Sequence, residues 1–511
     1  MKKKSVIALA LALVMVLSLF AGCGASKEEA KTRSTSGNQE KNAIAVALTG
    51  QAVSLDPQLF TQVHEDIVIN QVYESLFVLD NDSNPVNILC ESFTPDETGS
   101  SVEFVLKSGV KFHGGEDFTS ADVEYALSRC ENSALCSDLF TYSTIEVQDD
   151  THFTWNFPYA EMGAGFYELM SVVASLRIAS KSWCEGLLAD VNDDLGLQAN
   201  GTGAYMLGEI SNSGDITLNR FEDYHGEASI DTIYYKLVTG SQELAFESGD
   251  LDIATYGGAT FDAVKEYTNV ATMETYANNV SFLINNCDAA SPMNSIQVRE
   301  AAVRAMNRGD VNTVMFDGAS RPAYNMATPL VQYYDDCCDH FDQDAKKAQE
   351  LMTAAGYSES NPCAVTVISL ADPKWVAACE VLKENLEQAY FAVTIEEIPD
   401  TTRYFTGEFD IGLIAIGLTN SFTSYASLFD DASGLNLALY HEPDQQELID
   451  KIMASGDEAA AHEAMQAVVN TLAYVPLGYT TDLEAYDANL TAGIFYTANG
   501  DFFYREFSWN K

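Results

Sequence analysis

The segment 101–129 constrains the fold most, because three local signals follow one another within it. Large apolar residues fall on every second position over 102–106, which is the period of a half-buried strand, and Gly109 interrupts the run. A Gly-Gly turn follows, and Thr119 then stands three residues before Asp122, the spacing of a helix capping box. The segment therefore predicts a strand, a turn and a helix that begins near Ser120.

Strand and helix patterns also alternate between 344 and 417. A helix pattern that ends at Gly356 is followed by a strand at 364–369, a helix at 373–390, and strands at 393–398 and 409–417. Such alternation is typical of a parallel sheet with helices on both faces. The folded part of the chain is too long for one compact core, so it predicts two or three lobes.

These pieces resemble the extracellular solute-binding proteins of family 5, the peptide- and nickel-type receptors of ATP-driven importers. The resemblance begins with Phe-x-Leu-Lys-x-Gly-Val-Lys-Phe-x-x-Gly at 104–115, followed by the Ala-Asp-Val helix that ends in Ser-Arg. Asn307 departs from the family, which has Asp before the arginine at this point. Further matches are Leu-Asp-Pro at 55–57, Tyr-Glu-x-Leu at 73–76, Gly-Thr-Gly-x-Tyr at 201–205, Val-Arg-x-Ala at 298–301 and Tyr-x-Pro-Leu at 474–477.

The resemblance implies an α/β fold, a two-lobed periplasmic-binding-protein-like clamp (type II) with an extra small α+β domain. It implies capture of a small solute, with peptides the leading class, by lobe closure and delivery to the permease subunits of an ABC transporter. The expected organisation is a signal peptide at 1–22, a flexible tether at 23–42, a first lobe at 43–73, 182–289 and 487–511, an additional domain at 74–181, and a second lobe at 290–486.

The amino terminus predicts export. Three lysines precede an apolar run at 6–21 that is short for a membrane span and ends in Gly22-Cys23. Residues 19–23 resemble a bacterial lipobox, in which Cys23 is lipidated, although Phe20 replaces the usual Leu. We therefore expect a lipoprotein anchored to the outer face of the cell membrane; the alternative is a secreted protein with a chance cysteine.

Charge and cysteine content limit the partners. The formal net charge is −48, which argues against nucleic acid and against anionic lipid surfaces. We expect a monomer that binds no cofactor and no metal. Cys130 and Cys136 could pair, but scattered free thiols are the other reading of ten unpatterned cysteines. Cys337, Cys338 and His340 have ligand-type side chains without the spacing of a zinc clamp, which favours a surface loop.

No catalytic motif stands out. The chain has no Gly-x-Ser-x-Gly, no His-Glu-x-x-His and no Walker loop, and its seven histidines are dispersed. The glycine-rich turn at 200–205 lacks the lysine and the helix that a phosphate loop needs. With 75 acidic residues, counting alone leaves a paired-carboxylate glycosidase open. We therefore expect a binding protein, with a secreted hydrolase of glycans or peptides, or a receptor that feeds a sensor, as alternatives.

Position in the resemblance gives candidates for the binding cleft, which needs aromatic surface and convergent polar groups. Ordinary loop or core packing is the alternative for each of them. The candidates are Ser175, Tyr256, Gly257, Asn278, Asn279, Gly417, Thr419, Asn420 and Tyr479.

One departure bears on the ligand. In the peptide receptors, a strand like 409–413 leads into Trp-x-Ala-Asp-Tyr, whose carboxylate pairs with the peptide's terminal ammonium. This chain has Ile-Gly-Leu-Thr-Asn at 416–420, so the Trp and the Asp are both missing. Because Thr419 and Asn420 carry no charge, we expect acetylation of a peptide's amino terminus to weaken binding by less than about tenfold.

Overall fold

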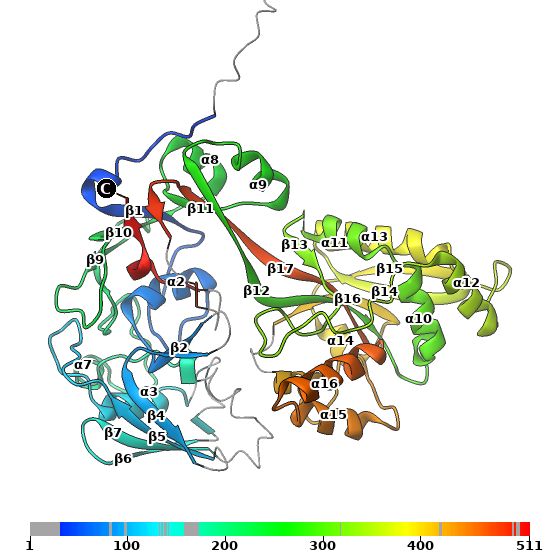
Figure 1. Ribbon diagram of the computed structural model, residues 1–511, viewed down its shortest axis with the longest axis horizontal. Coiled ribbons are helices and arrows are strands. Elements are labelled where there is room, and N and C mark those ends of the chain that lie inside the picture. Colours follow the sequence, from blue (N-terminus) through cyan, green and yellow to red (C-terminus); the bar gives the residue numbers. More distant parts are fainter. Residues whose placement is uncertain are drawn as a thin grey trace, which may run out of the picture.

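Two lobes joined by two long strands make up the structure (Figure 1). The linking strands are β12 (Val270–Asn285) and β17 (Tyr474–Asp487), which pair antiparallel. The signal sequence predicted at 1–22 and the lipidation predicted at Cys23 lie outside the described residues. The computed structural model describes residues 31–80, 84–96, 100–131, 133, 136, 140–141, 143–157, 173–316, 318–417, 422–492, 495–496 and 501–510.

A four-stranded sheet forms the core of the first lobe, in the order β1-β10-β9-β8. Strands β1 and β10 are parallel, and the other pairs are antiparallel. Ile44 and Val46 of β1 pack with Val68 of α2 in one buried cluster. The elements of this lobe are η1 (Gln39–Lys41), β1 (Ala43–Leu48), α2 (Val63–Val72), α7 (Lys181–Leu187), β8 (Tyr205–Ile210), β9 (Ile216–Arg220), β10 (Thr232–Leu237), α8 (Gln242–Ser248), α9 (Gly258–Val264), β18 (Leu490–Thr491), η4 (Tyr504–Glu506) and β21 (Ser508–Trp509).

Close packing explains the glycine-rich turn at 200–205. A Cβ atom on Gly201 would clash with the carbonyl oxygen of Val72, and one on Gly203 would clash with that of Gln71. The glycines therefore allow this turn to pack against the end of α2. Gly249 ends α8 with a φ of 84°, the left-handed conformation that favours glycine at a helix C-terminus.

A second antiparallel sheet, in the order β4-β5-β7-β6, forms a small α+β unit. Strand β5 begins at Ser101 and helix α3 at Ser120, so the predicted strand, turn and helix are confirmed. The backbone N–H of Thr119 donates to Asp122 Oδ2 over 2.8 Å, as the capping box requires. The unit comprises β2 (Phe77–Leu79), β3 (Pro85–Asn87), β4 (Cys90–Pro95), β5 (Ser101–Leu106), α3 (Ser120–Ser128), β6 (Thr144–Val147) and β7 (His152–Asn156).

A disulfide joins Cys130 to Cys136 just after α3. Of the two readings of the cysteines, pairing is therefore right for these two residues. The other cysteines within the described residues are free thiols, and most are buried: Cys90, Cys184, Cys287, Cys337, Cys338, Cys363 and Cys379.

The second lobe is built on the sheet β11-β17-β12-β16-β14-β15. The strand and helix alternation predicts the parallel pairs of β14 with β15 and β16 correctly, but β12 and β17 run antiparallel, so the sheet is mixed. One edge strand of the sheet, β11 (Ile253–Thr255), pairs with β17 where β17 reaches the first lobe. The remaining elements of the second lobe are η2 (Pro292–Asn294), α10 (Ile296–Ala305), α11 (Arg308–Phe316), β13 (Ser320–Pro322), α12 (Ala345–Ala354), β14 (Cys363–Leu370), α13 (Pro373–Glu387), β15 (Phe391–Ile398), α14 (Thr402–Thr406), β16 (Ile411–Ile416), η3 (Phe422–Leu428), α15 (Gln445–Met453) and α16 (Glu458–Asn470).

Both faces of this sheet are covered. Figure 1 shows α11 and α13 on one side of it and α15 and α16 on the other. Strand β12 serves both cores, because Phe282 and Ile284 belong to one buried cluster and Leu283 to the other. Within the described residues, the structure contains no helix with the length and apolar character required to cross a bilayer.

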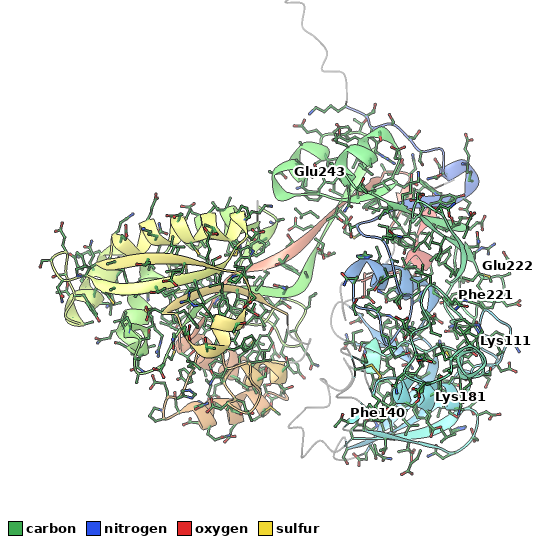
Figure 2. All side chains as sticks on the ribbon, turned by 180° about the vertical axis from the view of Figure 1, so that it is seen from behind. Lys111, Phe140, Lys181, Phe221, Glu222 and Glu243 are labelled. Atoms are coloured by element: carbon green, nitrogen blue, oxygen red, sulfur yellow. A yellow bond between two sulfur atoms is a disulfide. The ribbon has the colours of Figure 1, made fainter. Side chains whose placement is uncertain are left out.

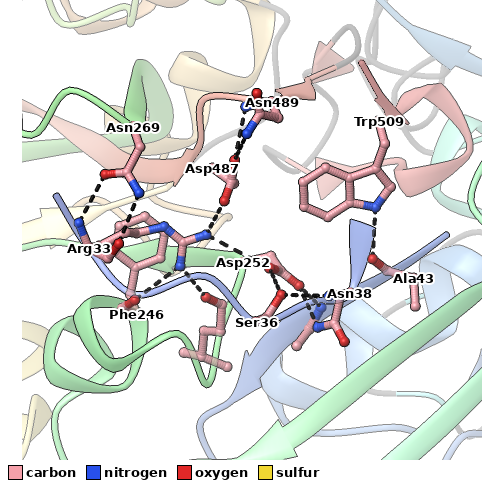
Figure 3. A network of polar contacts seen from close by, with 12 residues as sticks. Arg33, Ser36, Asn38, Ala43, Phe246, Asp252, Asn269, Asp487, Asn489 and Trp509 are labelled. Atoms are coloured by element: carbon pink, nitrogen blue, oxygen red, sulfur yellow. Dashed lines mark hydrogen bonds and ion pairs between the residues drawn. The ribbon is translucent and has the colours of Figure 1, made fainter. Parts of the chain in front are cut away.

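Part of the predicted tether is held against the folded domain (Figure 3). Arg33 is 4% exposed, and its Nη2 lies 2.7 Å from Asp487 Oδ2 at the end of β17. Asn38 Nδ2 donates to Asp252 Oδ2 over 2.7 Å. The sequence prediction of a flexible tether thus extends too far, because residues in this segment supply the cation and the N–H groups that two buried carboxylates need.

Candidate ligand-binding site

A pocket of about 260 Å³ opens where β17 enters the first lobe. Its walls come from β1, α2, α8, β11, β17 and η4. Val46, Ile67 and Ile253 give it an apolar side, while hydroxyl and carboxyl groups face it from the strands. The described lining residues come from the first lobe and from the end of β17 that enters it, so the pocket lies on the first-lobe side of the strands that join the lobes. Figure 1 shows β12 and β17 running from this lobe to the other.

Two carboxylates of β17 line this pocket. Asp482 and Glu484 are two residues apart, so the strand directs both side chains to the same face. Glu484 is 7% exposed, and its Oε1 accepts a hydrogen bond of 2.9 Å from Thr255 Oγ1. Thr255 stands directly opposite Glu484 in the pairing of β11 with β17. The register of the sheet therefore fixes the position of the buried carboxylate.

Burial governs the titration of this pair. Desolvation raises the pKa of Glu484 to about 8, with a further contribution from the charge of Asp482, and desolvation also raises the pKa of Asp482. No lysine or arginine is among the pocket-lining residues. His64, Gln242 and Tyr504 add polar groups to the wall. The described lining of the pocket can therefore accept hydrogen bonds and hold a cation, but it supplies no permanent cation for an anionic group.

A smaller pocket of about 170 Å³ lies in the second lobe. Arg308 stacks over the Tyr324 ring at 4.5 Å, and that ring stacks on His340 at 3.7 Å. Desolvation lowers the pKa of Arg308, which donates to the carbonyl oxygen of His340 over 3.1 Å. Among the described residues there is no group of three or more side chains placed to hold a metal, at Cys337 and Cys338 or elsewhere.

Two of the candidate residues named from the sequence lie at the end of β11. Tyr256 is 4% exposed and meets the Phe246 ring edge-on, at 6.1 Å between centroids. The backbone N–H of Gly257 donates to Glu243 Oε1 over 3.1 Å, and Gly257 precedes α9 as its N-cap. Figure 2 shows Glu243 on α8 at the top of the first lobe. Both residues thus follow directly on Thr255, which lines the pocket.

Another group of candidates meets at the crossing between the lobes. The pairing of β12 with β17 shifts register between Tyr276 and Val280, and Asn278 and Asn279 lie in this irregular stretch. Val280 pairs with Tyr479, whose hydroxyl donates to the carbonyl oxygen of Asn325 over 2.9 Å. The structure therefore brings these three candidates together beside the strands that join the lobes.

Gly417 belongs to the same region: it is exposed directly after β16, whose last residue, Ile416, pairs with Val280 next to Asn279. Ser175 is half-buried in the chain that follows the small α+β unit. Thr419 and Asn420 lie outside the described residues. Sequence reasoning missed Asp482 and Glu484, although acids on alternate positions after the Tyr-x-Pro-Leu motif are visible in the sequence.

Comparison with known proteins identifies the family. The profile described as "Bacterial extracellular solute-binding proteins, family 5 Middle" matches residues 84–436, which is more than half of the chain. The chain belongs to the bacterial extracellular solute-binding proteins of family 5. The resemblance seen in the sequence motifs is thereby confirmed, and this family 5 protein can be compared with its relatives.

Glutathione-binding protein GsiB of Salmonella typhimurium is 26% identical to this family 5 protein over 328 residues, which cover 62% of this chain and 62% of GsiB. The match thus spans less than two thirds of that relative. HbpA2 from Haemophilus parasuis superposes with a TM-score of 0.82 at 17% identity, covering 92% of this chain and 100% of HbpA2.

The oligopeptide-binding protein AppA from Bacillus subtilis, solved in complex with a nonapeptide, superposes with a TM-score of 0.70 at 19% identity. The superposition covers 92% of this chain and 99% of AppA. These likenesses confirm the predicted fold class, a two-lobed α/β clamp of the type II periplasmic-binding-protein kind with an extra small domain.

Proposed function

We propose that this family 5 protein is the substrate-binding component of an ABC importer, and that it captures small peptides between its lobes and passes them to the permease. The observation that carries the proposal is the junction itself: β12 and β17 join the lobes, and a polar pocket opens beside them. The relatives named for glutathione and peptide binding support the same class of ligand. The proposed ligand-binding residues are the candidates named from the sequence: Tyr256, Gly257, Asn278, Asn279, Gly417 and Tyr479, together with Ser175, Thr419 and Asn420.

We propose the sequence-derived boundaries as the units that move. The first lobe is 43–73 with 182–289 and 487–511, the additional domain is 74–181, and the second lobe is 290–486. The sheet β1-β10-β9-β8 falls inside the first lobe, and the sheet β4-β5-β7-β6 falls inside the additional domain, which supports the division between these two units. The register shift between Tyr276 and Val280 is a point at which β12 can bend.

Lobe closure is the test of the proposal. A ligand that contacts both lobes favours the closed state, so small-angle scattering should show a smaller radius of gyration with peptide than without it. The comparison uses the purified protein before and after addition of a tripeptide mixture at saturation. An unchanged radius of gyration, with the peptide retained, would favour a rigid cleft and count against a clamp.

Binding without chemistry is part of the proposal. The carboxylates Asp482 and Glu484, both with raised pKa values, are the feature that favours the alternative of a secreted hydrolase. The two functions differ in what they return, because a receptor releases its peptide intact and a hydrolase releases fragments. Mass spectrometry of a peptide and glycan mixture after overnight incubation therefore separates them.

Anchoring through Cys23 completes the proposal. Each buried acyl methylene is worth about 0.8 kcal/mol, so the two chains of a diacylglyceryl cysteine hold a protein stably on a membrane. We expect Cys23→Ala to move the protein from the membrane fraction to the soluble fraction of the producing cells. Cys90→Ala, which alters a buried thiol within the fold, is the control and should stay with the membrane. Retention of the Cys23 variant after a high-salt wash would place the anchor elsewhere.

A further inference from the structure

The carboxylate of Glu484 differs from the other buried acids of the chain in its partners. Six other acids are buried among the described residues, namely Asp56, Glu65, Glu74, Asp122, Asp252 and Asp487. Asp56, Glu74 and Asp487 each pair with an arginine: Arg129, Arg505 and Arg33, respectively. Glu65, Asp122 and Asp252 each accept at least two N–H hydrogen bonds.

Glu484 has no such partner. Among the described residues, its carboxylate accepts only from the neutral hydroxyl of Thr255, and the charge that acts on it is that of another acid, Asp482. A buried carboxylate without a cation is costly, and folded proteins normally pair it. Since Glu484 faces a pocket, a group that enters the pocket can supply the missing charge.

We propose that Glu484 and Asp482 form a subsite for a ligand ammonium group, so that this receptor selects solutes that carry an amine. The inference rests on the proposed function, because it names the chemistry of the ligand that the lobes would enclose. It also revises the expectation drawn from Thr419 and Asn420: the acid missing from that segment is replaced by two acids on β17.

The side chains that line the pocket favour an amine over a metal ion. An ammonium group has three N–H donors, and the carboxylates of Asp482 and Glu484 provide acceptors for them. The apolar wall of Val46, Ile67 and Ile253 suits the carbon atoms next to such a group. A divalent metal prefers more protein ligands, and the described part of the chain has no cluster of three or more ligating side chains.

The charge of the whole chain acts in the same direction. A formal net charge of −48 attracts cationic solutes and repels anionic ones over the range that salt leaves unscreened. The other titratable groups that face the subsite are His64 of α2 and Tyr504 of η4. Since burial favours the protonated form of Glu484, the entry of an ammonium group should release a proton from this carboxyl.

The experiment offers the protein a choice between matched peptides. Tripeptides without Lys, Arg or His are supplied as equal amounts of the free and the amino-terminally acetylated form, and the peptides that co-elute with the protein in gel filtration are quantified by mass spectrometry. We expect the retained pool to favour the free form by at least about tenfold. A second pool of acetylated peptides that contain lysine shows whether a side-chain amine can replace the terminal one.

The decisive variant is D482N/E484Q, which keeps the shape of both side chains and replaces both carboxyl groups with amides that cannot become anionic. Its preference for the free form should fall to less than about twofold, with a circular dichroism spectrum like that of the unchanged protein. The matched control is D223N/E227Q, which makes the same two acid-to-amide changes on an exposed stretch of the first lobe and should keep the preference. If D482N/E484Q prefers the free form as strongly as the unchanged protein does, the proposed subsite is wrong.

A peptide-free probe separates this inference from the proposed function. We expect 1,5-diaminopentane to raise the melting temperature of the unchanged protein and of D223N/E227Q but not that of D482N/E484Q. If no peptide is retained while the diamine still acts this way, the peptide function is wrong and the subsite stands. If peptides are retained in both forms equally, or if the diamine has no effect that depends on the two acids, the subsite is wrong.

Discussion

Arg129→Met is expected to lower the free energy of unfolding by about 3–5 kcal/mol, because it leaves a buried carboxylate without its cation. Arg129 is fully buried, and its Nη2 forms an ion pair with Asp56. Its Nη1 also donates to the carbonyl oxygen of Val191 over 2.8 Å. Methionine fills a similar volume but satisfies none of these acceptors.

The pH dependence of this loss has a definite sign. Desolvation raises the pKa of Asp56, and the charge of Arg129 opposes that rise. Without Arg129, the folded protein holds a proton on Asp56 more tightly than the unfolded chain does, so its stability falls as the pH rises. Urea denaturation at pH 7 and at pH 4.5 should therefore show a larger penalty for the variant at pH 7.

A surface arginine provides the control. Arg220 is about one third exposed and pairs with Asp231 and with Glu222, which Figure 2 shows at the outer edge of the first lobe. Arg220→Met should cost less than about 1 kcal/mol, the usual value of exposed ion pairs. Equal losses in the two variants would contradict the assignment of Arg129 as the cation of a buried pair.

Local signals in the sequence predict much of the fold. Thr119 and Asp122 predict the start of α3, because a capping box is a contact between near neighbours in the chain. Leu-Asp-Pro and Ser-Arg are likewise readable as separate motifs. The contact between Asp56 of the first motif and Arg129 of the second cannot be predicted from the sequence, because the two residues are 73 positions apart and no local rule links them.

Long-range pairing also explains the predictions that failed. The segment around Arg33 has a polar composition that predicts a tether, yet Asp252 and Asp487, far along the chain, hold it against the fold through Asn38 and Arg33. The sheet of the second lobe is mixed because β12 enters this lobe from the first lobe and β17 leaves it in the opposite direction, with no crossover helix between the two paired strands that would make them parallel.

The binding site shows the same division between local and long-range information. Resemblance led to Tyr256 and Tyr479 by their positions next to motifs, and both lie near the strands that join the lobes. The role inferred for Glu484 could not be read from the sequence, because a chain with 75 acids gives no reason to single out one of them. Burial next to Thr255, without a cation, is what distinguishes it.

Glu484→Gln is expected to stabilise the ligand-free protein at alkaline pH. Burial raises the pKa of Glu484 from 4.5 to about 8, so between these values the folded protein carries a proton that the unfolded chain has lost. Stability then falls as the pH rises through this window, and the full loss is reached above the folded pKa. Each unit of such a rise corresponds to about 1.4 kcal/mol, so the variant, which has no proton to lose, should gain a few kcal/mol at pH 9.

Melting temperatures measured from pH 4 to pH 9 test this expectation on the unchanged protein, Glu484→Gln and Glu227→Gln. The first two curves should meet near pH 4, where both side chains are neutral, and should separate steadily toward pH 8. Glu227→Gln removes an exposed acid of the first lobe, so its curve should follow that of the unchanged protein. Curves that stay parallel for Glu484→Gln over the whole range would mean that this carboxyl titrates normally and has found a cation within the fold.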